Sequence, residues 1–102
     1  MLRRDRRVDK LWGRLREFLR EAESLDPETV TESRKKVSLW DLEGSPVRTK
    51  NVICNSFGVD TIWDLVHVPY DQIAKFRCFS NSRAALSELV FAFDEAIGIL
   101  KA

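Results

Sequence analysis

The 102-residue sequence lacks the features that would indicate a secreted or membrane protein. No apolar run reaches the roughly 18 residues that a membrane span needs, and the arginine-rich start is not followed by the apolar segment of a signal peptide. The two cysteines, Cys54 and Cys78, are far apart and belong to no Cys-x-x-Cys or Cys/His cluster. We expect buried, reduced thiols in a cytoplasmic protein.

Groups that could carry catalysis are also scarce. His67 is the single histidine, and no serine, cysteine or carboxylate constellation surrounds it in the sequence. The acidic residues of the second half are scattered, namely Asp60, Asp64, Asp71, Asp94 and Glu95. We therefore predict no enzyme activity, no metal site and no cofactor.

The charge is divided unevenly along the chain. Hydrophobic residues make up 44% of the sequence and charged residues 32%, which is typical of a globular protein. Residues 1–36 hold 11 Lys/Arg and 8 Asp/Glu, a net of +3, whereas residues 37–102 hold 6 and 8, a net of −2. We expect two parts: 1–36, a basic amphipathic helix and linker, and 37–102, a helical domain.

Residues 2–25 are predicted to form one amphipathic helix. Apolar residues recur at spacings of three and four, as in a heptad seam: Val8, Leu11, Leu15, Phe18, Ala22 and Leu25. This seam packs either on the same chain or on a second copy, and its apolar character favours a homodimer at micromolar concentration. Asp26 and Pro27 could start a short second helix, and residues 31–36 are expected to be a linker.

Four basic residues share one face of this helix, at spacings of four, three and four: Arg3, Arg7, Lys10 and Arg14. Like charges at these spacings repel, and cations near a helix N-terminus oppose its dipole. Two interpretations stay open. The face is solvated and partly neutralised by Asp5 and Asp9, or it is a phosphate-binding stripe.

The second part has the start and stop signals of several short helices. An extended segment over 37–44 is followed by a helix with Ser45 as its cap and Pro46 at its first position, ending before Gly58. Further helices are expected over 60–67, capped by Asp60 or Thr61, and over 68–76. A tight loop over 78–82 then leads to a last helix over 82–100, whose apolar positions follow the 3.6 period. The predicted fold is all-α: a long N-terminal amphipathic helix, then a compact bundle of about four short helices with a helix-hairpin-helix.

Three segments of the second part resemble the C-terminal domain of the bacterial RNA polymerase alpha subunit. "LWDLEGSPVRTKNVI" is similar to the family's extended Asp-Leu segment that leads into a helix with a Val-Arg-Ser-x-Asn motif. "GVDTIWDLV" resembles its Gly-Ile-x-Thr-Ile-Gly-Asp-Leu-Val stretch, and "YDQIAKFRCFSNSRAALSEL" its helix-hairpin-helix. The resemblance covers about residues 37–100.

The resemblance implies a DNA-binding protein that acts in transcription. That family binds A·T-rich DNA in or across the minor groove, and Arg48 and Asn51 match its DNA-contacting Arg and Asn. We expect Lys50, Ser82 and Arg83 to contribute as well. The chemistry is suitable, because Arg fits a narrow electronegative groove and Asn can bond to base-edge acceptors. By itself, the Arg48/Asn51 pair could also be a surface pair that caps the helix or forms an ion pair.

Some residues depart from the family pattern. Ser80, Asn81, Ser82 and Arg83 stand where the family has a hairpin glycine and paired lysines, so fewer phosphates would be neutralised and affinity should be weaker. The large assembly domain found in that family is absent from the sequence, so we expect a freestanding relative. The alternative is an adaptor that docks on RNA polymerase, a sigma factor or an activator with little DNA affinity. No membrane partner is expected.

Overall fold

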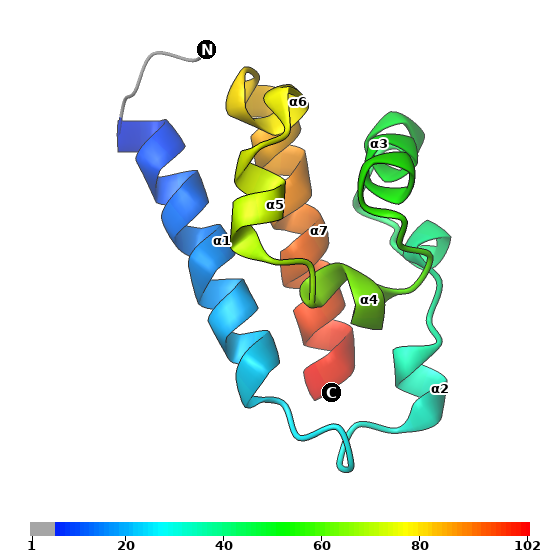
Figure 1. Ribbon diagram of the computed structural model, residues 1–102. Helices are drawn as coiled ribbons and strands as arrows, with labels where there is room; N and C mark the ends of the chain where they lie inside the picture. Colours follow the sequence, from blue (N-terminus) through cyan, green and yellow to red (C-terminus); the bar gives the residue numbers. More distant parts are fainter. Residues whose placement is uncertain (1–5) are drawn as a thin grey trace.

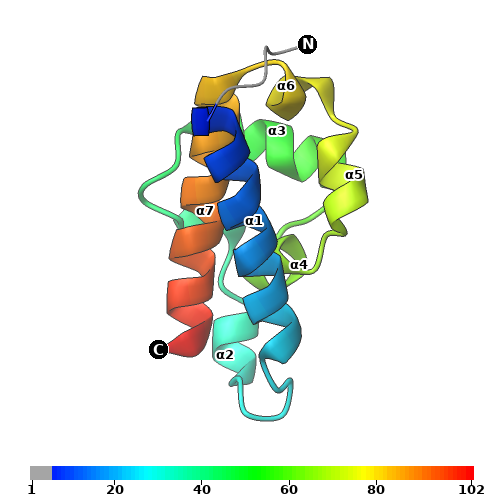
Figure 2. The same cartoon turned by 90° about the vertical axis from the view of Figure 1, so that its left-hand side faces the viewer.

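Two long helices, α1 (Arg6–Ser24) and α7 (Arg83–Lys101), lie side by side and form the spine of the molecule (Figures 1 and 2). The computed structural model describes residues 6–102. The two helices run in the same direction. Arg7 and Arg83, near their N-terminal ends, line one hollow, and near their C-terminal ends Oε2 of Glu21 lies 3.6 Å from Nζ of Lys101. Both N-termini therefore face one end of the molecule.

Six short elements cover this helix pair. They are α2 (Glu32–Lys35), the 3-10 turn η1 (Leu39–Asp41), α3 (Val47–Phe57), α4 (Ile62–Val66), α5 (Tyr70–Ala74) and α6 (Arg77–Ser80). Residues 6–102 contain no β-strand, only an isolated antiparallel bridge between Ser38 and Thr61. The predicted all-α fold is confirmed.

The apolar seam of α1 is buried within a single chain. Val8, Leu15, Phe18 and Ala22 are buried in the same hydrophobic core as the inner face of α7, and Leu11 and Leu25 are half-buried beside it. Trp12 of α1 packs edge-on against the ring of Tyr70 in α5, with 5.7 Å between the ring centres. Packing on its own chain, one of the two alternatives for this seam, therefore accounts for its apolar character, and the two predicted parts share one core.

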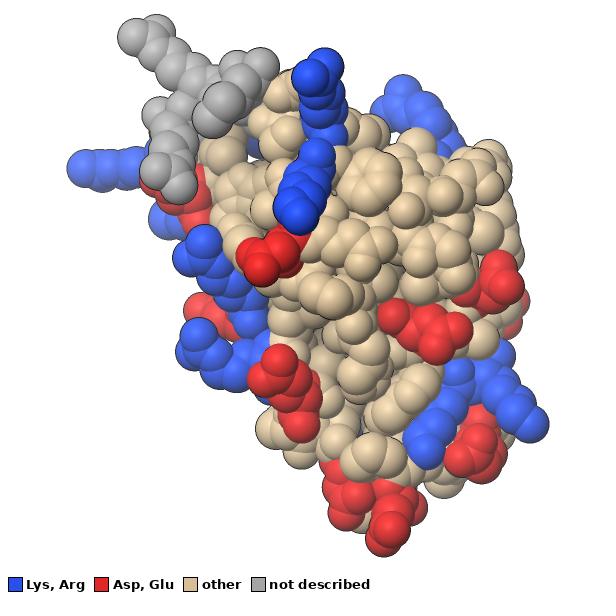
Figure 3. All heavy atoms as spheres, in the orientation of Figure 1, with Lys and Arg blue, Asp and Glu red and all other residues tan. Residues whose placement is uncertain are grey.

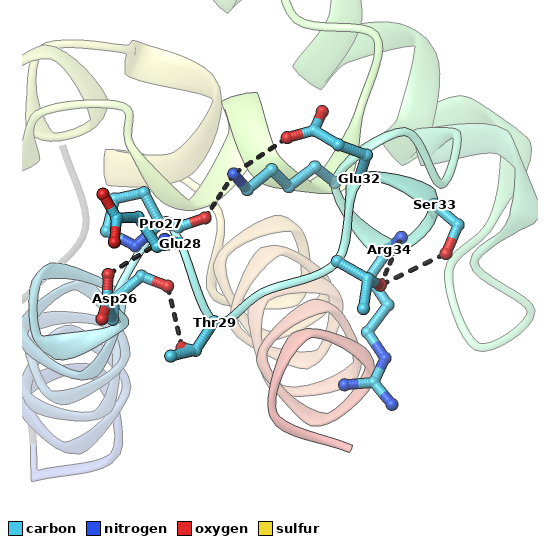
Figure 4. A network of polar contacts seen from close by, with 9 residues as sticks. Asp26, Pro27, Glu28, Thr29, Glu32, Ser33 and Arg34 are labelled. Carbon is cyan, nitrogen blue, oxygen red and sulfur yellow. Dashed lines mark hydrogen bonds and ion pairs between the residues drawn. The ribbon is translucent and has the colours of Figure 1, made fainter.

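The segment between α1 and α2 differs from the prediction (Figure 4). Instead of a helix at Pro27, a tight turn is held by Asp26, whose Oδ1 accepts from the Glu28 N–H at 2.9 Å. The expected linker contains α2, because the Thr31 side chain caps its first turn and Lys35 donates to the Pro27 carbonyl at 2.5 Å. This helix was not predicted, because its sequence is polar and charged and has no apolar stripe. The hydrogen bonds of the Thr31 and Lys35 side chains hold it in place.

Most boundaries of the later helices agree with their sequence signals. Gly58 ends α3 in the left-handed conformation (φ 66°), and Thr61 caps α4 by accepting from the Asp64 N–H. The cap of α3 is Pro46, whereas the Ser45 hydroxyl is buried without a hydrogen-bond partner in the structure. The prediction of a plain loop over 78–82 was wrong, because α6 occupies Arg77–Ser80 and buries Phe79.

The core contains the residues predicted for the inner face of the last helix. All six are buried: Leu86, Leu89, Val90, Phe93, Ala96 and Ile97. The thiols differ from expectation, since Cys54 is half-buried and Cys78 is exposed, and both are free. No helix in the described part of the chain is long and apolar enough to cross a membrane.

Candidate nucleic-acid interface

Arg48 and Asn51 lie on one exposed face of α3, one turn apart. The Arg48 side chain is 81% exposed. Arg48 is the second residue of α3, and no side chain caps this helix. The N–H groups of its first turn therefore have no side-chain cap, and such helix starts favour anions. The predicted pair is thus accessible, next to a helix end that favours anions.

Glu88 of α7 reaches the same place and was not expected there. Its Oε1 lies 3.8 Å from Nη2 of Arg48, and its Oε2 accepts a hydrogen bond from the Thr49 hydroxyl. Glu88 therefore links α7 to α3 and puts a negative charge beside the candidate DNA-contacting arginine. The Arg48 side of this pair is exposed, whereas Glu88 is half-buried. Because the arginine is open to solvent, the pair contributes only about 0.2–1 kcal/mol, so Arg48 can exchange it for a phosphate at small cost.

Lys50 is buried and lies away from the exposed Arg48/Asn51 pair. It is 7% exposed, and its Nζ donates to the Trp40 carbonyl at 3.1 Å. Position 50 is two residues from Arg48, which places it on the opposite side of α3, where it faces η1. The sequence did not reveal this burial, because the alkyl chain of a lysine can cover apolar surface while its ammonium group reaches a carbonyl.

The start of α7 separates two hollows. One, of about 280 Å³, lies between α3, α6 and α7, and both Arg48 and Ser82 line it together with Thr49, Val52, Cys78, Phe79, Ala85 and Glu88. The Ser82 hydroxyl caps α7 by accepting from the Ala85 N–H at 3.2 Å. Arg83, the next residue, lines the other hollow on the α1 side. Ser82 thus joins the Arg48 surface, and Arg83 does not.

The proposed basic stripe of α1 is only partly assembled. Arg7 and Lys10 are exposed and line the hollow that contains Arg83. Arg14 instead lies over the ring of Phe18, with its guanidinium carbon 5.0 Å from the ring centre. Arg3 lies outside the described residues. Two members of the predicted stripe therefore join a residue of the predicted hairpin site.

Charge is polarised along α1. Residues 1–16 contain seven Lys/Arg and two Asp/Glu, a net of +5, and residues 17–32 contain one and six, a net of −5. In the space-filling view, basic side chains follow the outer side of α1, and acidic side chains gather at the lower end (Figure 3). The overall charge of +1 hides this separation. The basic end is the one that carries the N-termini of α1 and α7.

A second surface, formed by Phe91, Glu43, Gly44, Asp94 and Glu95, has a different chemistry. Phe91 is 54% exposed, and a Cβ at position 44 would lie 2.2 Å from its ring. The Glu95 carboxylate accepts from the N–H groups of Glu43 and Gly44 at 2.9 and 3.1 Å. The result is an exposed aromatic ring beside three carboxylates, which we call the Phe91 surface. The exposure of this ring was not predicted, because its sequence neighbours in α7 are apolar.

The remaining polar groups of interest have structural roles. His67 Nδ1 lies 2.6 Å from the Trp63 carbonyl oxygen, and its ring packs on Trp63. Partial burial raises the pKa of the Cys54 thiol, and the Asp60 carboxylate, 3.5 Å away, raises it further. Within residues 6–102, no group of three or more His, Cys, Asp or Glu side chains is arranged to hold a metal ion.

The candidate interface therefore consists of Arg48 and Asn51 on α3, Ser82 at the start of α7, and a separate basic group on α1 and α7. Its elements come from both ends and from the middle of the chain, and they meet at the N-terminal end of the α1/α7 pair (Figure 2). No protein-family model, no curated protein and no solved structure matches this chain.

Proposed function

We propose that the protein binds double-stranded DNA and acts in transcription, with Arg48 and Asn51 contacting the minor groove of A·T-rich sequence. The observation that carries the proposal is the exposure of both side chains on one face of α3, beside its uncapped first turn. The resemblance of this segment to the C-terminal domain of the polymerase alpha subunit adds to it.

The chemistry supports each role. An arginine is attracted to the narrow, electronegative minor groove of A·T-rich DNA. An asparagine amide can donate to the acceptors that adenine and thymine present there. The free N–H groups at the start of α3 suit an adjacent phosphate. Glu88 opposes all three by its charge, so we expect modest affinity that depends strongly on salt.

Fluorescence anisotropy on A·T-rich and G·C-rich duplexes, at two salt concentrations, tests the proposal. Arg48→Ala should weaken binding to the A·T-rich duplex by roughly 1–3 kcal/mol and reduce the preference for it. Arg20→Ala is the matched control, because Arg20 is an equally charged, exposed residue in the acidic half of α1. If Arg48→Ala and wild type bind equally well, this surface does not contact DNA.

The Phe91 surface favours a second candidate function. An exposed aromatic ring beside Glu43, Asp94 and Glu95 suits a basic, apolar segment of a protein partner. In this alternative the protein is an adaptor that docks on RNA polymerase or an associated factor. The test is binding of purified polymerase holoenzyme to wild type, Phe91→Ser and Arg48→Ala. The adaptor function requires loss of binding in Phe91→Ser alone, and DNA binding without polymerase binding would reject it.

A further inference from the structure

Three cations from two helices surround the second hollow at the basic end of the molecule. Arg7 and Lys10 of α1 and Arg83 of α7 line it, together with Leu11, Ala84 and Ser87, and its volume is about 650 Å³. All three basic side chains belong to exposed residues. Among residues 6–102, none of the three has an acidic partner within ion-pair distance. Three positive charges thus share one hollow, and none of them is ion-paired to a carboxylate of residues 6–102.

This arrangement is unfavourable for the protein by itself. Because α1 and α7 are parallel, both N-termini lie at this end, and each carries the equivalent of about half a positive charge. Acidic side chains are the favourable choice at such positions. Asp9 is one in α1, yet Arg6, Arg7 and Lys10 also lie in its first turns, and Arg83 opens α7. Arg7 and Lys10, three residues apart, also repel each other. A bound anion would relieve every one of these repulsions.

The donors in the hollow suit a phosphate group in particular. Two guanidinium groups can each bond to two oxygens of one phosphate, and the lysine adds a point charge. Ser87 adds a hydroxyl group. The cap of α7 uses the N–H groups of Ala85 and Leu86, both of which bond to Ser82. Ala84, one residue earlier, lines the hollow. It belongs to the first turn of α7, where helical N–H groups lack an intrahelical partner.

We propose that Arg7, Lys10 and Arg83 form a phosphate-binding site, which holds the phosphodiester backbone of DNA while Arg48 and Asn51 contact the groove. The assignment of the phosphate to DNA rests on the proposed function. The two sites lie on opposite sides of the first turn of α7, since residues 82, 85 and 88 line the α3 hollow and residues 83, 84 and 87 the α1 hollow. Helix α1 is thereby part of the DNA interface and not only of the core.

Loss of the phosphate site and loss of Arg48 should change different properties of DNA binding. Backbone contacts carry no sequence information but set the salt dependence, with a slope of about −0.9 per phosphate contact. In the full chain, the double variant Arg7→Gln/Lys10→Gln should weaken binding to A·T-rich and G·C-rich duplexes by the same factor, roughly tenfold to a hundredfold, and flatten the salt slope by about one to two. Arg48→Ala should instead reduce the preference for A·T-rich DNA.

A matched control keeps the net charge equal. Arg20→Gln/Lys36→Gln also removes two exposed cations, from the acidic half of α1 and from the end of α2, and should leave the salt slope close to that of wild type. A double variant Arg7→Gln/Lys10→Gln that binds both duplexes with the wild-type affinity and slope would overturn the site, while A·T-selective binding through Arg48 would still stand.

Titration with inorganic tripolyphosphate, followed by ¹H–¹⁵N NMR, separates the site from the proposed function. Tripolyphosphate should shift the amide signals of Ala84 and Ser87 in wild type, and at least tenfold more weakly in Arg7→Gln/Lys10→Gln. If it does so while no duplex binds, the phosphate site is supported and DNA binding is rejected. If tripolyphosphate leaves Ala84 and Ser87 unshifted in wild type, the site is rejected.

Discussion

Glu88→Gln is expected to strengthen DNA binding, although it removes an interaction from the folded protein. Glutamine keeps an oxygen that can accept from the Thr49 hydroxyl, and it removes only the charge beside Arg48. The wild-type carboxylate occupies the arginine that the proposed interface needs and repels any phosphate that approaches. Both effects disappear in the variant, so the sign of the change is opposite to that of most interface substitutions.

The magnitude follows from the geometry. Nη2 of Arg48 lies 3.8 Å from Oε1 of Glu88, and the two side chains are 81% and 26% exposed. Because the arginine is open to solvent, freeing it from this pair is worth about 0.5 kcal/mol. A phosphate about 7 Å from the carboxylate is repelled by about 0.6 kcal/mol in water-like dielectric. The sum of about 1 kcal/mol corresponds to roughly fivefold tighter binding.

Anisotropy on an A·T-rich duplex measures this change, with Asp94→Asn as the charge-matched control. Asp94 is an exposed residue six positions further along α7, a rise of about 9 Å, and screening at physiological salt reduces its effect to less than about twofold. Combining Glu88→Gln with Arg48→Ala should abolish about half of the gain. If Glu88→Gln binds no more tightly than Asp94→Asn, Arg48 does not meet DNA at this surface.

Two further predictions concern the core and the thiols. Leu89 is fully buried in α7, so Leu89→Ala should lower the free energy of unfolding, measured by urea titration, by about 2–5 kcal/mol. Ser87→Ala, at an exposed position of the same helix, is the control. A loss below about 0.5 kcal/mol in Leu89→Ala would contradict the packing. Cys78 should react with iodoacetamide before Cys54 at pH 8, as followed by peptide mass spectrometry, because the raised pKa of Cys54 lowers its thiolate fraction and Cys78 is exposed. Since Cys78 lines the Arg48 hollow, bound DNA should slow its alkylation and leave Cys54 unchanged; equal protection of both thiols would argue against that surface.

Local signals in the sequence were sufficient for the longer helices and for much of the core. The stop at Gly58 was predicted from cap chemistry, and Thr61 was one of two caps proposed for α4. The inner face of α7 was predicted from its period. The helices that escaped prediction, α2 and α6, have four residues each and no apolar stripe. Helix α2 is capped by the Thr31 side chain, and α6 has no side-chain cap but buries Phe79. Periodicity records neither contribution.

The site was predictable only where one helix face defines it. Arg48 and Asn51 share a face of α3, so their spacing was informative. Lys50 lies next to Asn51 in the sequence, but its side chain reaches η1 on the other side of the helix. A motif match cannot tell which of two neighbouring residues faces solvent. The approach of Glu88 to Arg48 and of Arg83 to Arg7 depends on how α7 packs between α3 and α1. Such contacts follow from the tertiary arrangement, and no local pattern specifies them.

The basic face of α1 depends on the packing of its apolar face. Its charges oppose the helix dipole at both ends, with cations in the first turns and Glu21 but no basic residue in the last turn, and Gly13 in its interior costs roughly 1 kcal/mol relative to alanine. Such a helix would be unstable alone in water. It forms because Leu15 and Phe18 are buried in the shared core. The positive face that includes Arg7 and Lys10 therefore exists only while the inner face is packed, so the apolar seam and the proposed phosphate site depend on the same contacts.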